Sequence, residues 1–178
     1  MNVRYDYYIN NAQSVLENKY PKELKDTISV ISGINSSACR VKVSQEKGRK
    51  GKLLYSPTQL NGSFKNILSN SGWHPYKIKI FSRLKGNILS GEREIDFFKN
   101  SVGTEIQFGK YAFMLNDIFG KLQLFYDRNV IDVGICIVPT AQFALNMSTG
   151  VSTFEYLYST LENINICPNL PIAVFGIE

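Results

Sequence analysis

The sequence predicts an α/β fold in which a mixed β-sheet, antiparallel in one half and parallel in the other, is flanked by helices. Residues 76–81, 91–98 and 102–108 are strand-like segments separated by short turns, which is typical of an antiparallel meander. The apolar segments 131–138 and 170–177 each follow a stretch with helical spacing, which favours parallel strands joined by crossover helices. Together these observations indicate a sheet with helices on its faces.

The length and composition of the chain indicate one globular domain with a basic surface. Its 178 residues are enough for one full core and too few for two, so we expect a single domain over residues 1–178. Hydrophobic residues make up 44% and charged residues 20%, as in ordinary globular proteins. The net charge of +5 favours a polyanionic partner, although many basic proteins bind no nucleic acid.

The cysteines and the apolar segments bear on where the protein works. Cys39, Cys136 and Cys167 are odd in number and show no C-x-x-C spacing, which argues against a disulfide framework or a zinc site and favours the reducing cytoplasm. The first residues lack an apolar signal core, and no apolar run is long enough to span a bilayer. We therefore expect a cytoplasmic protein that is neither secreted nor bound in a membrane.

In chain order, the N-terminal part predicts two consecutive helices. Residues 12–32 carry apolar side chains at helical spacing, and Pro21 suits the first turn of the second helix. Three tyrosines within residues 5–8 are expected to pack against the first helix. Residues 35–52 are polar and basic and predict a solvated loop, which either follows a phosphate backbone or is a mobile surface segment.

A third helix and the meander come next. Ser56 can cap this helix, and Pro57 suits its first turn. One stripe of its apolar side chains is expected to pack in the core: Leu60, Phe64, Ile67 and Leu68. Turns at 85–87 and 99–101 then separate the three strands of the meander.

The C-terminal half alternates helices and buried strands. Residues 115–125 repeat apolar side chains at helical intervals before the strand at 131–138, and residues 154–164 do so before the strand at 170–177. Residues 140–152 resemble a long irregular loop. This alternation supports the parallel half of the sheet.

Asp96 and Glu105 are the candidate metal ligands. They lie on the second and third strands of the meander, where a hairpin can bring them side by side, with Gln107 on the same face as Glu105. Two carboxylates in one small pocket repel each other unless a divalent cation offsets the repulsion; Mg²⁺ is the natural candidate and Mn²⁺ its substitute. A solvated acidic residue on an ordinary hairpin is the alternative. The apolar surroundings favour the metal site, because an idle carboxylate pair would be costly there.

Two segments resemble a known family. The string IDFFKNSVGTEIQFGKYAFMLND (95–117) resembles the catalytic segment of the BglII-like restriction endonucleases, which have the PD-(D/E)XK nuclease core. Upstream, SPTQLNGSFKNILSNSGW (56–73) resembles the helix and Gly-Trp segment that precedes the catalytic strands in this group and in the related BstYI-like enzymes. The resemblance, which covers roughly residues 55–138, implies a restriction-endonuclease-like core.

For the site, the resemblance implies that Asp96, Glu105 and the backbone carbonyl of Ile106 hold the metal. Gln107 then stands in the place that lysine usually holds in the wider superfamily, and glutamine is the pattern of the BglII-like group. A lysine could position or deprotonate the attacking water, whereas an uncharged glutamine can only orient a water through hydrogen bonds. The metal must then generate the nucleophile.

For the activity, the resemblance implies a type II restriction endonuclease: a homodimer that uses Mg²⁺ to cut both strands of a short palindrome in double-stranded DNA, at sites containing GATC. Loop residues outside the sheet are expected to contact the bases: Lys110, Asn146, Ser148, Thr149 and Ser152. Lys110 could instead be simply solvated, and Ser152 or Thr153 could cap a helix. A repair nuclease of the same core with little sequence preference, and a DNA-binding module with an inactive site, are the alternative functions.

Overall fold

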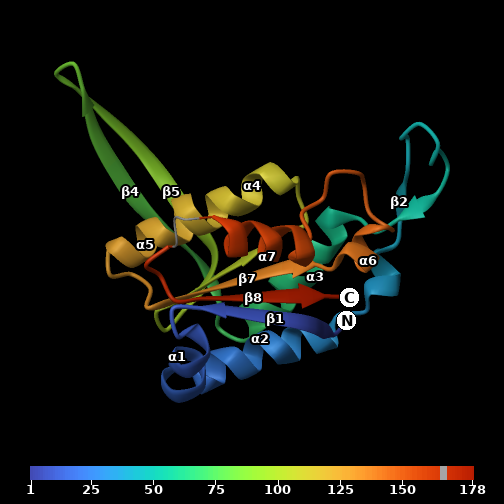
Figure 1. Ribbon diagram of the computed structural model, residues 1–178, viewed down its shortest axis with the longest axis horizontal. Helices are drawn as coiled ribbons and strands as arrows, with labels where there is room; N and C mark the ends of the chain where they lie inside the picture. The colour runs from blue at the N-terminus through green and yellow to red at the C-terminus, as the bar shows by residue number, and fades with distance from the viewer. Residues whose placement is uncertain (165–167) are drawn as a thin grey trace.

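The computed structural model describes residues 1–164 and 168–178, and a six-stranded sheet in the order β1-β8-β7-β6-β5-β4 lies at its centre (Figure 1). The strands are β1 (Val3–Ile9), β4 (His74–Leu84), β5 (Asn87–Lys99), β6 (Val102–Ile106), β7 (Val133–Pro139) and β8 (Ile172–Ile177). The β4-β5-β6 part is antiparallel and the β6-β7-β8 part is parallel. The predicted mixed sheet, with an antiparallel meander and parallel strands, is therefore confirmed.

Strand β1 has no counterpart among the predicted elements. It pairs antiparallel with β8 and closes the parallel edge of the sheet. The prediction that the first tyrosines pack against the first helix is wrong for Tyr5 and Tyr7, because alternate side chains of a strand point to opposite faces. Tyr5 stacks on Phe154 of helix α7 (Phe154–Asn163), with ring centres 5.4 Å apart, and Tyr7 contacts Tyr158 of the same helix.

Helices α1 (Ala12–Lys19) and α2 (Pro21–Gly33) confirm the two predicted N-terminal helices, with Pro21 in the first turn of the second. Helix α3 (Pro57–Asn70) begins after Ser56, whose hydroxyl accepts a hydrogen bond from the backbone N–H of Gln59 at 3.4 Å. The predicted cap of this helix is therefore correct.

The predicted solvated loop at 35–52 contains regular structure. It holds the 3₁₀ helix η1 (Ser36–Cys39) and the first strand of a small hairpin, β2 (Lys42–Val43) and β3 (Leu53–Leu54). Arg49 of this hairpin binds a segment that is distant in the sequence: its guanidinium donates hydrogen bonds to the carbonyls of Leu145 and Met147. The hairpin is thereby tied to the segment that follows β7.

The inner turn of the meander is a two-residue hairpin turn. Lys99 pairs with Val102, and Asn100 and Ser101 between them have φ angles of 47° and 63°. Two positive φ angles in succession are the mark of a type I′ turn, whose twist matches that of the flanking strands. This turn fixes which residues of β5 and β6 stand opposite each other.

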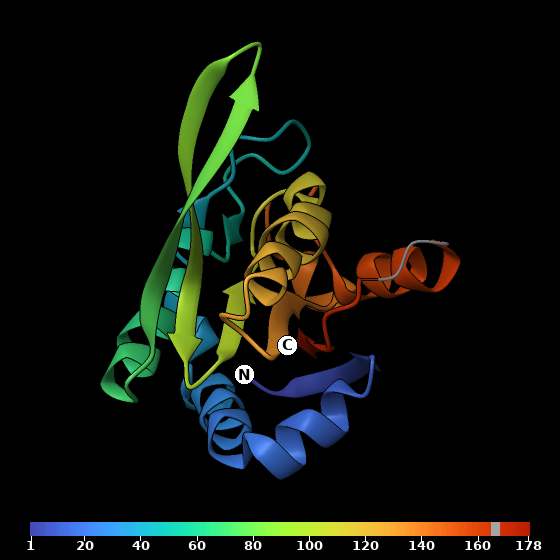
Figure 2. The same cartoon turned by 90° about the vertical axis from the view of Figure 1, so that its left-hand side faces the viewer.

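The outer turn lies at Lys85 and Gly86, within the predicted turn, but β4 and β5 are longer than the predicted strands. Their outer part, residues 79–93, forms an arm that projects beyond the body of the molecule (Figures 1 and 2). The arm exposes large apolar side chains: Phe81, Leu84, Ile88 and Leu89.

The helix predicted at 115–125 is part of a longer one. It consists of α4 (Tyr111–Leu115), the π-helical segment η2 (Asn116–Leu122) and α5 (Gln123–Asp127), in continuous succession. The predicted loop at 140–152 contains the short helix α6 (Ala141–Ala144). Thr153 is the residue that caps α7, since its hydroxyl accepts a hydrogen bond from the N–H of Tyr156.

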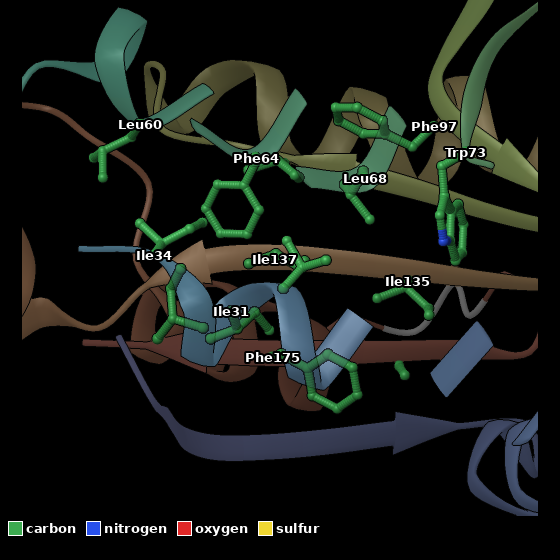
Figure 3. Packing of buried hydrophobic residues seen from close by; sticks show 14 of the residues in the cluster. Ile31, Ile34, Leu60, Phe64, Leu68, Trp73, Phe97, Ile135, Ile137 and Phe175 are labelled. Atoms are coloured by element: carbon green, nitrogen blue, oxygen red, sulfur yellow. The ribbon is translucent and has the colours of Figure 1, made fainter. Parts of the chain in front are cut away.

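Buried side chains pack on both faces of the sheet. On one face, α1, α2 and α3 cover β6 to β8, and Figure 3 shows Phe64 and Leu68 of α3 close to Ile137 and Ile135 of β7. On the other face, the α4–η2–α5 helix and α7 cover the alternate residues of the same strands, such as Cys136. Burial on both sides explains why the parallel strands are almost wholly apolar.

Two further predictions concern the cysteines and the membrane. Cys39 and Cys136 are buried free thiols, and Cys167 lies outside the described residues. Within residues 1–164 and 168–178, no helix is long and apolar enough to cross a bilayer.

Candidate active site

The structure brings Asp96 and Glu105 together where the β5–β6 ladder ends. The last pair of the ladder joins Phe97 to Thr104, so both acidic residues lie just beyond it. The backbone N–H of Asp96 donates a long hydrogen bond to Glu105 Oε1 at 3.4 Å. The hairpin geometry expected from the sequence therefore places the two residues side by side.

The backbone carbonyl of Ile106 faces the same place. Directly after β6, the N–H of Gln107 donates to the carbonyl of Ile137 on β7 at 2.9 Å. Successive residues of a strand direct their backbone polar groups to opposite neighbours, so the carbonyl of Ile106 is directed toward β5. Since the β5–β6 ladder has already ended, this carbonyl is available as a ligand beside Asp96.

Glu105 is a buried carboxylate that is neutralised by a lysine. Its residue is only 2% exposed, and its Oε2 lies 2.7 Å from Nζ of Lys121. Burial holds the pKa of Glu105 well above its usual range, the nearby charge of Asp96 raises it further, and Lys121 opposes both effects. Burial would lower the pKa of Lys121, but Glu105 and Asp117 outweigh it and raise that pKa. Each member of the ion pair therefore favours the charged form of the other.

Asp117 and Gln107 complete a buried charge network with Glu105 and Lys121. Lys121 Nζ also lies 3.3 Å from Asp117 Oδ1, and the Gln107 amide donates to Asp117 Oδ2 at 2.7 Å. The side-chain oxygen of Gln107 accepts from the N–H of Gly109 at 2.7 Å. A Cβ atom at position 109 would lie only 2.5 Å from that oxygen, so glycine is required for this bond. Both ends of the Gln107 amide are thus bound to the protein.

Asp117 and Lys121 both come from the π-helical segment η2 and were not among the predicted site residues. A π turn inserts an extra residue into a helix and changes the direction of the side chains around it, and such turns often occur at functional sites. The signal that could have pointed to them is their spacing of four residues, which is common for helical ion pairs.

Asp96 also borders a cleft between β5 and helix α3, with a volume of about 240 Å³. Asn61, Lys65 and Ser69 of α3 form one wall of this cleft. The remaining lining residues are Pro75, Glu94, Asp96, Phe97 and Ile106. Asp96 is therefore reached from solvent through this cleft, whereas Glu105 is buried.

Residues 5–177 match the family model described as "Restriction endonuclease BglII/BglIII". The chain belongs to this family. It is 26% identical over 180 residues to "Type II restriction enzyme BglII" of Bacillus subtilis. The aligned region covers 94% of this chain and 73% of that enzyme. The prediction of a type II site-specific deoxyribonuclease is therefore confirmed at the level of the family.

The fold agrees with that of BglII in two solved structures. All of this chain superposes on 77% of restriction endonuclease BglII crystallised with a DNA 16-mer, with a TM-score of 0.78 and 24% identity. It superposes on 80% of free BglII with a TM-score of 0.65 and 19% identity. The predicted restriction-endonuclease-like core is thereby confirmed.

In this member of the BglII/BglIII family, four of the five residues expected to contact bases lie on one side of the molecule. Lys110 Nζ donates to the carbonyl of Thr149 at 2.7 Å, and the N–H of Thr149 donates to Glu46 of the β2–β3 hairpin. Asn146 accepts from Arg40 and Ser148 accepts from Lys42, both beside the same hairpin. Ser152 differs, because it is fully buried.

The candidate ligands expected from the sequence are all oxygen atoms. Among the residues that the structure describes, no three His, Cys, Asp or Glu side chains are grouped to hold an ion by themselves. The carboxylates of Asp96 and Glu105 and the carbonyl of Ile106 offer a partial set, which water or a phosphate oxygen can complete. Oxygen donors of this kind suit Mg²⁺ and Mn²⁺.

Proposed function

We propose that this family member cuts both strands of double-stranded DNA at a short palindrome containing GATC, as a homodimer that uses Mg²⁺, with Mn²⁺ as a substitute. The observation that carries the proposal is the convergence of Asp96, Glu105 and the Ile106 carbonyl at the end of the β5–β6 ladder. Two-fold symmetry supports the homodimer, because each protomer then reads one half of a palindrome and cuts one strand.

The reaction is an in-line attack of water on a phosphodiester, with departure of the 3′ oxygen. A bound Mg²⁺ would supply activation of the water and charge for the phosphate oxygens. Asp96, Glu105 and the Ile106 carbonyl would hold the ion. Lys121 keeps Glu105 in one orientation with its negative charge compensated, through a contact of 2.7 Å. The protein thus presents its ligands already arranged, which lowers the cost of reorganisation during the reaction.

Gln107 acts on the site through its neighbours. The expectation that it orients a water stays a prediction, but its amide is bound to Asp117 and its oxygen to Gly109. We therefore propose that Gln107 is a positioning residue, which fixes Asp117 and through it Lys121. Where the wider superfamily has a lysine, this chain has Gln107. Lys121 of η2 would supply the positive charge to the site instead.

Base recognition is proposed for Lys110, Asn146, Ser148 and Thr149, which gather beside the basic β2–β3 hairpin. Their polar groups suit the edges of bases in the major groove. Ser152 would have to leave its buried position to take part. A cytoplasmic location remains part of the proposal, and the free thiols of Cys39 and Cys136 support it.

Digestion of a large DNA tests the proposal. We expect discrete fragments with Mg²⁺ or Mn²⁺, none with a chelator, and no fragments from DNA in which every GATC has been mutated. A smear would instead favour a nuclease with little sequence preference. Binding without any cleavage would favour a DNA-binding module, and sedimentation of the free protein as a monomer would contradict the homodimer.

A further inference from the structure

Helix α3 presents one line of polar side chains to the cleft. Asn61, Lys65 and Ser69 are spaced four residues apart, so they lie one above another on the same side of the helix. The neighbouring line of α3 is buried and holds the helix against the sheet: Leu60, Phe64 and Leu68. The polar line is therefore held rigidly at the entrance to the site.

The side chains of this line are not committed to the protein. In the described part of the chain, Asn61, Lys65 and Ser69 form no side-chain hydrogen bond or ion pair. Two nearby hydroxyls, one in the helix and one at its C-terminal cap, behave differently, since Ser63 donates to the carbonyl of Gln59 and Ser71 to that of Ile67. The donors that border the cleft are thus the ones left available for a ligand.

The two walls of the cleft differ in charge, because the α3 wall carries a lysine and neutral donors and the β5 wall carries carboxylates. Of its eight lining residues, Lys65 alone is basic, and it stands on the wall opposite Asp96 and Glu94. Glu94 is already paired with Lys77 at 2.9 Å, whereas Asp96 forms no ion pair within the described part of the chain. A group that carries negative charge and several acceptor oxygens could accept from the α3 donors on one side and share a cation with Asp96 on the other.

We propose that Asn61, Lys65 and Ser69 form a seat for a backbone phosphate of the DNA, at or next to the phosphodiester that is cut. This inference rests on the proposed function and adds to it the wall that holds the substrate opposite the metal ligands. The ammonium of Lys65 provides the charge, and the amide of Asn61 and the hydroxyl of Ser69 provide neutral donors. Contacts of this kind position the duplex and carry no base preference.

The test is the salt dependence of DNA binding by Lys65→Met, measured by fluorescence anisotropy on a duplex of about 20 base pairs with Ca²⁺ in place of Mg²⁺. We expect Kd to rise about tenfold, and the slope of log K against log salt to fall by about one unit, because one phosphate contact is lost. The loss should be the same on duplexes with and without GATC. Asn61→Ala and Ser69→Ala should weaken binding by about threefold without changing the slope.

Lys22→Met is the matched control, because Lys22 is an exposed lysine of α2 that does not border the cleft. It should leave both Kd and slope near the wild-type values, and thermal unfolding should show that every variant is folded. Equal slopes for Lys65→Met and Lys22→Met would overturn the inference, as would a loss confined to the GATC duplex. If the wild-type protein binds no duplex at all, the proposed function itself fails.

Discussion

The two walls of the site use their polar groups in opposite ways. On the inner wall, Glu105, Lys121, Asp117 and Gln107 bind one another at distances of 2.7–3.3 Å. On the outer wall, the polar side chains of α3 border the cleft and make no bonds to the rest of the described chain. The inner wall is thus organised before any ligand arrives, and the outer wall awaits one. Substitutions should therefore affect folding and chemistry on the inner wall, but only binding on the outer wall.

The sharpest test of this contrast compares the two acidic residues. Asp96→Asn and Glu105→Ala should each lower the cleavage rate by more than about 1,000-fold, since each removes a ligand of the metal. Only Glu105→Ala should also destabilise the fold, by about 3 kcal/mol, because the half-buried Lys121 loses its closer carboxylate partner and keeps only Asp117 at 3.3 Å. Asp96 is exposed, so its variant should unfold at the wild-type urea concentration. Complete plasmid digestion by either variant would refute the assignment of the site.

Lys121→Met should have the next largest effect. We expect cleavage in single-turnover assays to fall about 100-fold and Mn²⁺ binding by calorimetry to weaken, because Glu105 loses the cation that orients it. The double variant Lys121→Met/Gln107→Lys should cleave about tenfold faster than Lys121→Met, because the native Gln107 side chain already reaches Asp117 and a lysine there would return a positive charge to the network.

Lys99→Met is the control for Lys121→Met. Lys99 forms an ion pair of the same length, 2.7 Å, with Asp26 outside the charge network; the exposure of the two lysines is similar, although Asp26 is more exposed than Glu105. Its variant should lose stability and keep its cleavage rate. Cleavage by Lys121→Met within about twofold of this control would show that the lysine has only a structural role.

Gly109→Ala should disturb the inner wall more mildly. The added methyl group would lie 2.5 Å from the side-chain oxygen of Gln107 and force that side chain out of place. We expect cleavage to fall about tenfold, as for Gln107→Ala, and the double variant to be no worse than either single variant, because all three remove the same support. Additive losses in the double variant would mean that the two residues act separately.

The smallest expected effect is on the pH dependence of stability. Burial raises the pKa of Glu105, so above pH 4.5, the ordinary value, the folded protein retains a proton there that the unfolded chain has lost. The free energy of unfolding should therefore fall as pH rises, until the folded carboxyl is ionised as well. Glu105→Gln should remove this part of the slope in urea titrations without metal. Parallel curves for variant and wild type would contradict the burial of the charge.

Local patterns in the sequence were sufficient for much of the fold. Pro21 and Ser56 mark their helix starts through chemistry that acts within one turn, and the turn at Asn100 and Ser101 joins neighbouring strands. The same local rules placed Asp96 beside Glu105, because a tight hairpin sets the register of both strands. These features depend on residues that are close together in the chain.

The features that were missed depend on distant partners. Strand β1 pairs with β8 at the other end of the chain, and its polar residues hide the alternation typical of a strand. Lys121 belongs to a helix whose apolar spacing is evident, but the π turn that directs it leaves no mark in that spacing. Lys65 resembles any solvated helix residue until the position of α3 beside β5 is known.

The segment η2 makes the site sensitive to the number of residues in the helix, more than to their identities. One residue fewer between Asn116 and Leu122 would convert the π turn to an α turn and change which side chains of this segment face Glu105. Lys121 and the apolar side chains that follow it could then not both keep their places. In an alignment of relatives, we therefore expect varied amino acids on the outer surface of this helix, but no insertions or deletions within it.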